Sequence, residues 1–264
     1  MHELLKKENA LGIVLCVCVV LICAATLIVT QAFCRQYTPR PAVTPSPVPT
    51  AAPTPVPTPV PTPTPEPVPT PEPYLPPREL EIAREINPHV IGWLEIPDTR
   101  IRYPILRHPT QDNYYLNLTI DGESGYPGSI YTNSMEGENF DTFNTVIYGH
   151  NMADGTYFGS LKSYNDADFL AAHREIDIYT PTRLHRYDVI AVVCYDDRYI
   201  TDRYDDTAEA DRVAFLKSLQ KFGAVIPADA EVSTDGHIIT LSTCIGGMPN
   251  NRLLIVASER DGEE

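Results

Sequence analysis

The chain has 264 residues, and 18 of its 26 prolines lie between positions 39 and 77. The first 77 residues carry no net charge, so the whole formal charge of −15 belongs to the remaining 187. A segment of that length is enough for one domain with a sizeable core. Its acidity argues against nucleic-acid binding, which needs a basic face, and 43% apolar residues exclude wholesale disorder.

An uncharged run from Leu11 to Phe33 follows the ten N-terminal residues. At about 1.5 Å per residue it would reach roughly 34 Å, enough to cross the hydrocarbon layer of a membrane. A cleaved signal peptide is the alternative, but its apolar region is usually about 7–15 residues long and ends at small residues. This run is longer and ends in Phe33-Cys34. We therefore expect residues 1–10 to be cytoplasmic and residues 11–33 to form an uncleaved transmembrane anchor.

Residues 34–77 are expected to form an extended linker. From position 39 onwards, proline alternates with Thr, Val, Ala and Glu. Proline lacks the backbone N–H and fixes φ, so this stretch can form neither helix nor sheet. As a polyproline II spacer with a rise of about 3.1 Å per residue, it could hold the following domain roughly 110 Å from the membrane. Such a spacer fits a path through a cell wall.

Residues 78–264 have the pattern of a mainly β domain. A short amphipathic helix is expected at 78–86, with Leu80, Ile82 and Ile86 as its apolar residues. Two further helices are expected around 157–172 and 207–222, the second with Ala210, Val213, Leu216 and Leu219 on one face. Several of the apolar runs are nearly continuous, which is typical of strands buried on both faces. The runs predict about eight strands, at 91–96, 101–106, 128–132, 145–148, 175–180, 187–195, 237–243 and 253–257. The pattern predicts a barrel with helices at its start and in its connections.

Cys194 and Cys244 are the two cysteines of this domain. They could pair in a disulfide if the domain is exported. Cys194 lies in the run VIAVVCY and is expected to be buried in a core strand. Cys244 ends the run IITLSTC and precedes a glycine-rich turn, which is a plausible position for a nucleophile. A free thiol has a pKa near 8.5, so a catalytic cysteine needs a base or a cation beside it.

Two residues could supply those groups. His150 follows the apolar run TVIY and Gly149, which places an imidazole just past a strand end. Arg252 opens the run RLLIVA after the turn that follows Cys244, and its planar guanidinium could donate to a developing oxyanion. Each signal is weak alone, because most single histidines and arginines are solvated surface residues or satisfied core residues.

Together these residues resemble the catalytic set of the sortases. The segment TLSTC, ending at Cys244, resembles the TLxTC signature of that family, with Arg252 on the next strand and His150 in YGHNM. The stretches NPHVIGWLEIPDTRIRYPIL, DNYYLN, GSIY and NTVIYGHNMADGTYFGSLKSY resemble class B sortases in particular. The resemblance covers essentially all of residues 78–264.

The resemblance implies an eight-stranded barrel with an N-terminal helix and a helix in the long connection before the cysteine strand. It implies a cysteine transpeptidase of the outer face of Gram-positive bacteria, with no cofactor and no metal. Cys244 would attack a sorting signal, and an amine of the peptidoglycan would resolve the thioacyl-enzyme. His150 would be the general acid and base, and Arg252 would stabilise the oxyanion. The residues implied for substrate binding are Ser242, Thr243, Asn113 and Leu116.

Some features depart from this pattern or leave alternatives open. Ile245 follows the cysteine where some class B members have a polar or acidic residue. Acidic clusters such as 121–123 could bind calcium, although solvated loops are the simpler reading. The alternatives are a pilus-assembling sortase, a cysteine protease that passes the acyl group to water, and a non-enzymatic stalked binding module. The charged end SERDGEE favours anchoring of surface proteins over pilus assembly.

Overall fold

The structure, a computed structural model, describes residues 74–231 and 233–260. The expected transmembrane anchor and the linker up to residue 73 lie outside these residues. None of the helices within them is long and apolar enough to cross a membrane. Tyr74 is already attached to the folded domain, because its hydroxyl donates to the carbonyl oxygen of Thr180 at 2.8 Å. Contacts with the domain therefore begin four residues before the predicted boundary at 78.

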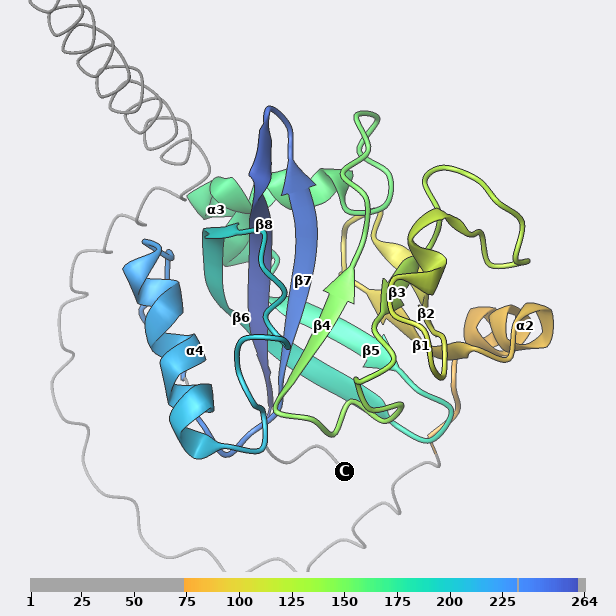
Figure 1. Cartoon of the computed structure of the whole chain (residues 1–264), viewed down its shortest axis with the longest axis horizontal. Coiled ribbons are helices and arrows are strands. Elements are labelled where there is room, and N and C mark those ends of the chain that lie inside the picture. The colour runs from red at the N-terminus through yellow and green to blue at the C-terminus, as the bar shows by residue number, and fades with distance from the viewer. Residues whose placement is uncertain (1–73, 232, 261–264) are drawn as a thin grey trace, which may run out of the picture.

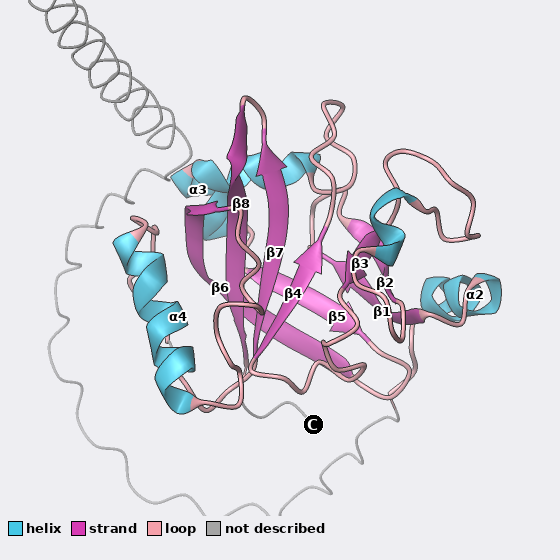
Figure 2. Cartoon of the chain, viewed as in Figure 1, coloured by secondary structure: helices cyan, strands magenta, loops and turns pink. Residues whose placement is uncertain are grey.

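The described chain forms a closed mixed barrel of eight strands, as predicted (Figures 1 and 2). Its order is β1-β2-β3-β4-β7-β8-β6-β5, and the β2–β3 and β4–β7 pairs are parallel while the other pairs are antiparallel. The elements in chain order are α2 (Arg78–Ile86), β1 (Val90–Glu95), β2 (Arg102–Arg107), η1 (Tyr114–Asn117), β3 (Ile130–Thr132), β4 (Asn144–Tyr148), η2 (Gly159–Asn165), α3 (Ala167–Ala172), β5 (Glu175–Tyr179), β6 (Leu184–Asp196), α4 (Glu209–Lys221), β7 (Ile238–Ile245) and β8 (Met248–Glu259).

The nearly continuous apolar strands are buried on both faces. Along β7, Ile239, Leu241 and Ile245 point into the core inside the barrel. Ile238, on the opposite face, belongs to a second apolar cluster outside the barrel. Helix α4 covers that second cluster in the connection between β6 and β7 (Figure 1). The helix therefore explains why the strands beneath it, β6 and β8 above all, carry apolar residues on both sides.

The two predicted amphipathic helices exist, but their buried faces differ from the prediction. In α2, Leu80 and Ala83 are buried, whereas Ile82 and Ile86 are 45% and 53% exposed. In α4 the buried residues are Phe215, Ser218 and Leu219, while Ala210 is exposed. Burial follows the i, i+3, i+4 spacing that faces the barrel, and the apolar residues off that face remain in solvent.

The helix expected over 157–172 is divided in two. A 3₁₀ segment, η2, ends at Asn165, and α3 begins after Asp166. The Asp166 side chain accepts hydrogen bonds from the backbone N–H groups of Asp168 and Phe169, both at 3.0 Å. This is an N-cap, which starts a new helix at that residue.

Candidate active site

The strand register brings the predicted catalytic residues to one edge of the barrel. Tyr148 at the end of β4 pairs with Ser242 of the parallel strand β7. His150 and Cys244 each lie two residues further along. Parallel strands end at the same edge of a sheet, so the two residues arrive side by side although they are far apart in the sequence.

Three hydrogen bonds connect the chain around His150 to the chain around Cys244. The N–H of Gly149 donates to the carbonyl oxygen of Ser242 at 3.2 Å. The Thr243 hydroxyl donates to the carbonyl oxygen of Gly149 at 2.7 Å. The Asn151 side-chain amide donates to the carbonyl oxygen of Cys244 at 2.8 Å. Both neighbours of His150 are thus bonded to Cys244 or to the residues before it.

The side chain of Cys244 lies on the outer face of the barrel wall. Residues 239, 241 and 245 of β7 contribute to the core inside the barrel, and side chains alternate along a strand. Cys244 is a free, exposed thiol. Cys194 is buried in β6 as predicted. The possible disulfide between these two cysteines is therefore excluded.

Arg252 is the antiparallel partner of Cys244 across the β7–β8 pair. Directly opposed residues of such a pair carry their side chains on the same face. The Nη1 group of Arg252 donates to the carbonyl oxygens of Pro249 and Asn251 at 3.0 and 2.9 Å. No hydrogen bond within the described residues involves its Nε or Nη2 group. The guanidinium is thus held at one end and keeps donors for a ligand at the other.

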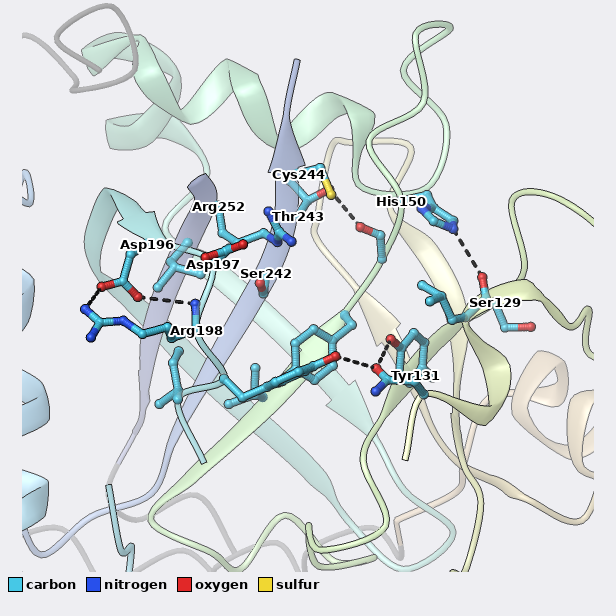
Figure 3. Close-up of a pocket in the computed structure, with 18 residues that line it drawn as sticks. Ser129, Tyr131, His150, Asp196, Asp197, Arg198, Ser242, Thr243, Cys244 and Arg252 are labelled. Carbon is cyan, nitrogen blue, oxygen red and sulfur yellow. Dashed lines mark hydrogen bonds and ion pairs between the residues drawn. The ribbon is translucent and has the colours of Figure 1, made fainter. Parts of the chain in front are cut away.

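The His150 imidazole is contacted by the segment around η1. Its Nε2 lies 3.1 Å from the carbonyl oxygen of Leu116. A carbonyl oxygen can only accept, so Nε2 is the donor. The ring of Tyr126 lies against the imidazole with a centroid separation of 4.9 Å. No hydrogen bond within residues 74–231 and 233–260 joins the thiol to the imidazole. In Figure 3, His150 and Arg252 lie on opposite sides of Cys244.

A cavity of about 440 Å³ opens beside these three side chains (Figure 3). Its wall includes all seven residues singled out in the sequence, namely Cys244, His150, Arg252, Ser242, Thr243, Asn113 and Leu116. Their positions differ in character. Thr243 is only 3% exposed, and its hydroxyl donates to the carbonyl oxygen of Gly149. Leu116, in contrast, is 37% exposed. The geometry gives Thr243 a part in holding the site together.

Sequence reasoning missed a wall of tyrosines in this cavity. Tyr131 and Tyr199 both donate from their hydroxyls to Oδ1 of Asn113, at 2.8 and 3.2 Å. Tyr131 also stacks with Tyr148 at a centroid separation of 5.4 Å. Burial raises the pKa of Tyr131 and of Tyr148 well above the usual value, so both hydroxyls stay neutral at physiological pH. The period-2 spacing of Val146 and Tyr148 on β4 is the one signal that could have placed part of this wall.

Asn113 is held from several sides. It adopts a left-handed backbone conformation with φ of 55°, which asparagine tolerates better than most residues. Its backbone N–H donates to Oδ1 of Asn133 at 3.1 Å. Because Oδ1 of Asn113 already accepts from two tyrosines, its side-chain N–H groups are the part of the amide that remains for a ligand.

Comparison with known proteins gives a consistent picture. The sortase domain profile matches residues 94–260. Sortase B of Listeria monocytogenes is 36% identical over 170 residues, which are 63% of this chain and 67% of that protein. Sortase B of Bacillus anthracis is similar in structure, with a TM-score of 0.62 and 29% identity over 72% of this chain and 88% of its own. A Staphylococcus aureus sortase B–substrate complex has the same TM-score and 26% identity, over 70% of this chain and 86% of its own. The similarity covers most of the barrel described above.

Proposed function

The chain belongs to the sortase family as a cysteine transpeptidase of the sortase B type, and we propose that Cys244, His150 and Arg252 carry out its reaction. The observation that supports this assignment most directly is the shared edge of the barrel. The β4–β7 and β7–β8 registers bring an exposed thiol, an imidazole and a guanidinium to one cavity. These are the nucleophile, acid–base and oxyanion groups that acyl transfer requires.

In the first half of the reaction, the Cys244 thiolate attacks a backbone carbonyl carbon of the bound peptide. A C–S bond forms, and the negative charge on the carbonyl oxygen is stabilised by the free N–H groups of Arg252. The tetrahedral intermediate then collapses and the C–N bond breaks. The leaving nitrogen takes a proton from His150, and the acyl group stays on Cys244 as a thioester.

In the second half, an amine attacks the thioester carbon. The amine gives up a proton to His150, a new C–N bond forms, and the C–S bond breaks to release the Cys244 sulfur. General acid–base catalysis of this kind typically contributes about 10²–10⁴-fold. The same thioester can also pass to water, which would give a carboxylic acid product and make the enzyme a protease.

The acyl part of the peptide belongs in the cavity lined by tyrosines. Asn113 offers its side-chain N–H groups there, and Ser242 adds a hydroxyl. Leu116 and Leu254 supply apolar surface. A cavity with a few fixed polar groups on an apolar wall suits a short extended peptide. The substrate complex of the Staphylococcus aureus relative supports a sorting-signal peptide as the occupant.

We further propose that the enzyme acts outside the cell on a surface protein. The uncharged run at 11–33 would anchor it in the membrane, and the proline-rich linker at 34–77 would extend the domain into the wall. The acceptor would then be an amine of the peptidoglycan. The run at 11–33 and the linker up to residue 73 lie outside the described residues, so their sequence carries this part of the proposal.

The test uses the full chain purified in detergent, with a panel of quenched fluorescent sorting-signal peptides. Cleavage is measured with and without a primary amine, and mass spectrometry identifies the products. We expect cleavage by the parent enzyme, an amide-linked product when amine is present, and a thioacyl-enzyme on Cys244. Cys244→Ala should abolish all three.

Two outcomes would contradict the proposal. Cleavage that gives only the acid product at saturating amine would identify a protease. No cleavage of any peptide, together with an unreactive Cys244 thiol, would support a stalked binding module instead. Met135→Ala serves as the control, because Met135 is 72% exposed and does not line the cavity.

A further inference from the structure

Tyr126 is a large, exposed aromatic residue that lies against the catalytic imidazole. Its side chain is 69% exposed, and its ring is inclined by 42° to that of His150 at a centroid separation of 4.9 Å. Within the described residues its hydroxyl makes no hydrogen bond, and the ring contacts no other aromatic ring. Within the described residues, the imidazole is therefore the one aromatic ring that this tyrosine contacts.

The loop that carries Tyr126, residues 118–129 between η1 and β3, is held in a defined shape. The N–H of Gly125 donates to the carbonyl oxygen of Asn117 at 3.0 Å. The hydroxyl of Ser129 donates to the carbonyl oxygen of Leu118 at 2.8 Å. Gly128 has φ of +70°, and a Cβ there would lie 2.2 Å from the carbonyl oxygen of Leu116. The loop backbone thus fixes the position from which the Tyr126 side chain extends toward His150.

The same stretch of chain contacts His150 at two places. Leu116 accepts the hydrogen bond from Nε2 at the edge of the imidazole, and Tyr126 covers part of its face. His150 is part of the cavity wall and Tyr126 is not. Tyr126 therefore contacts the imidazole without belonging to the acyl pocket.

This position corresponds to the amine side of the reaction. If the acyl group occupies the tyrosine-lined cavity, the leaving and entering nitrogens must be near His150, which exchanges protons with them. An aromatic ring beside that point excludes water from the face of the imidazole and offers apolar contact to the carbon chain of an amine. Water has no such chain and gains nothing from the ring.

We propose that Tyr126 is a specificity-determining residue for the acceptor, and that it favours resolution of the thioacyl-enzyme by an alkyl amine over resolution by water. This inference rests on the proposed function. In the favoured step the amine nitrogen forms the new C–N bond, its proton passes to His150, and the C–S bond breaks to release the Cys244 sulfur. In the competing step a water oxygen forms a C–O bond, its proton passes to His150, and the same C–S bond breaks to release the Cys244 sulfur and the acid.

The experiment compares these two fates of the same thioacyl-enzyme. The full chain is supplied with a cleavable peptide and pentylamine, and mass spectrometry measures the ratio of amide to acid product. A single-turnover measurement gives the acylation rate separately. The variants are Tyr126→Ala, which removes the ring, and Tyr126→Phe, which keeps it. Met135→Ala removes another exposed apolar side chain away from the site.

For Tyr126→Ala we expect the amide-to-acid ratio to fall roughly 2- to 10-fold, the size of effect that one aromatic contact produces. Tyr126→Phe and Met135→Ala should stay within about twofold of the parent enzyme in this ratio. A structural defect alone would lower acylation and leave the ratio unchanged, because both products come from one intermediate.

An unchanged ratio in Tyr126→Ala overturns the inference, whether or not acylation slows. A ratio that falls equally in Tyr126→Phe also overturns it, because the ring would then not be the discriminating group. In both cases the parent enzyme still forms its thioacyl intermediate, so the proposed function stands. A parent enzyme that forms no such intermediate refutes the proposed function, and the role of Tyr126 with it.

Discussion

The side-chain amide of Asn151 donates to the backbone carbonyl oxygen of Cys244 over 2.8 Å, and so joins the residue after His150 to the proposed nucleophile. This bond reaches across two strand ends that are 93 positions apart in the sequence. A positioned acid–base group and nucleophile contribute to rate only while their separation is maintained. Asn151 is therefore expected to matter for turnover more than for stability.

Asn151→Ala should lower kcat about 10-fold, in the range that small misplacements of catalytic groups produce. KM and the free energy of unfolding should change little, because the Asn151 side chain lies at the surface. Steady-state cleavage and urea unfolding measure the two effects. Asn165→Ala is the matched control, since Asn165 makes a comparable side-chain bond to the carbonyl oxygen of Lys162 away from the site. Equal losses in both variants would contradict this role.

Thr243 supplies a second connection, through its hydroxyl bond to Gly149. Thr243→Val keeps the shape of the side chain but leaves the Gly149 carbonyl without that donor. We expect a loss of about 1–2 kcal/mol in stability, as for a buried unsatisfied acceptor, and a lower kcat. Thr243→Ser keeps the hydroxyl and should restore most of both. If Thr243→Ser were as impaired as Thr243→Val, the methyl group and not the hydrogen bond would be the important feature.

Arg252 is expected to tolerate no conservative replacement. One end of its guanidinium is bound to the carbonyl oxygens of Pro249 and Asn251, and the other end keeps its donors for the oxyanion. A lysine ammonium is a point donor that cannot serve both ends at once. Arg252→Lys should therefore lower kcat about 10²–10³-fold, the usual effect of losing an oxyanion donor.

The control for this replacement is Arg174→Lys. Like Arg252, Arg174 has a guanidinium that is fixed by hydrogen bonds. It donates to the carbonyl oxygen of Val189 and to the carboxylate of Asp229, but it lies outside the cavity. Its replacement should leave the cleavage rate of the peptide unchanged. A fully active Arg252→Lys enzyme would show that positive charge alone, without the planar fork, is sufficient.

Glu136 makes stability depend on pH. This residue is 3% exposed, and burial raises its pKa to about 8. Its unfolded value is about 4.3. Between these two values the folded protein holds a proton that the unfolded chain has released, so the free energy of unfolding falls as pH rises. The slope is at most about 1.4 kcal/mol per pH unit for one proton.

Glu136→Gln mimics the protonated side chain and should remove this slope. The variant should be more stable than the parent enzyme above about pH 8 and close to it near pH 5. Urea unfolding across this pH range measures the difference. Glu138→Gln, at an exposed carboxylate two residues away, should retain the slope. The same slope in Glu136→Gln and in the parent would show that other groups cause it.

The sequence allowed the barrel to be predicted, and it singled out three residues that the structure brings to one cavity, because these signals are local. A continuous apolar run indicates a doubly buried strand, and a functional residue just past its end lies at the barrel edge. The buried face of α4 was predicted less well, since Ala210 and Leu219 look equivalent until the barrel surface is known. The roles of Thr243, Asn151 and Tyr126 depend on partners 94, 93 and 24 positions away, and no local pattern carries that information.

The β4–β7 register has a consequence for the fidelity of the site. Side chains alternate along a strand, so a slip of β7 by one residue would turn Cys244 toward the barrel interior and bring Leu241 to the outer face of the sheet, beside polar residues. The apolar residues of β7 thus oppose a one-residue slip, which would bury the Cys244 thiol. The exposure of the Cys244 thiol therefore depends on apolar side chains that lie inside the barrel and do not line the cavity. A substitution in that core that shifts the register of β7 would abolish activity without changing any residue of the site.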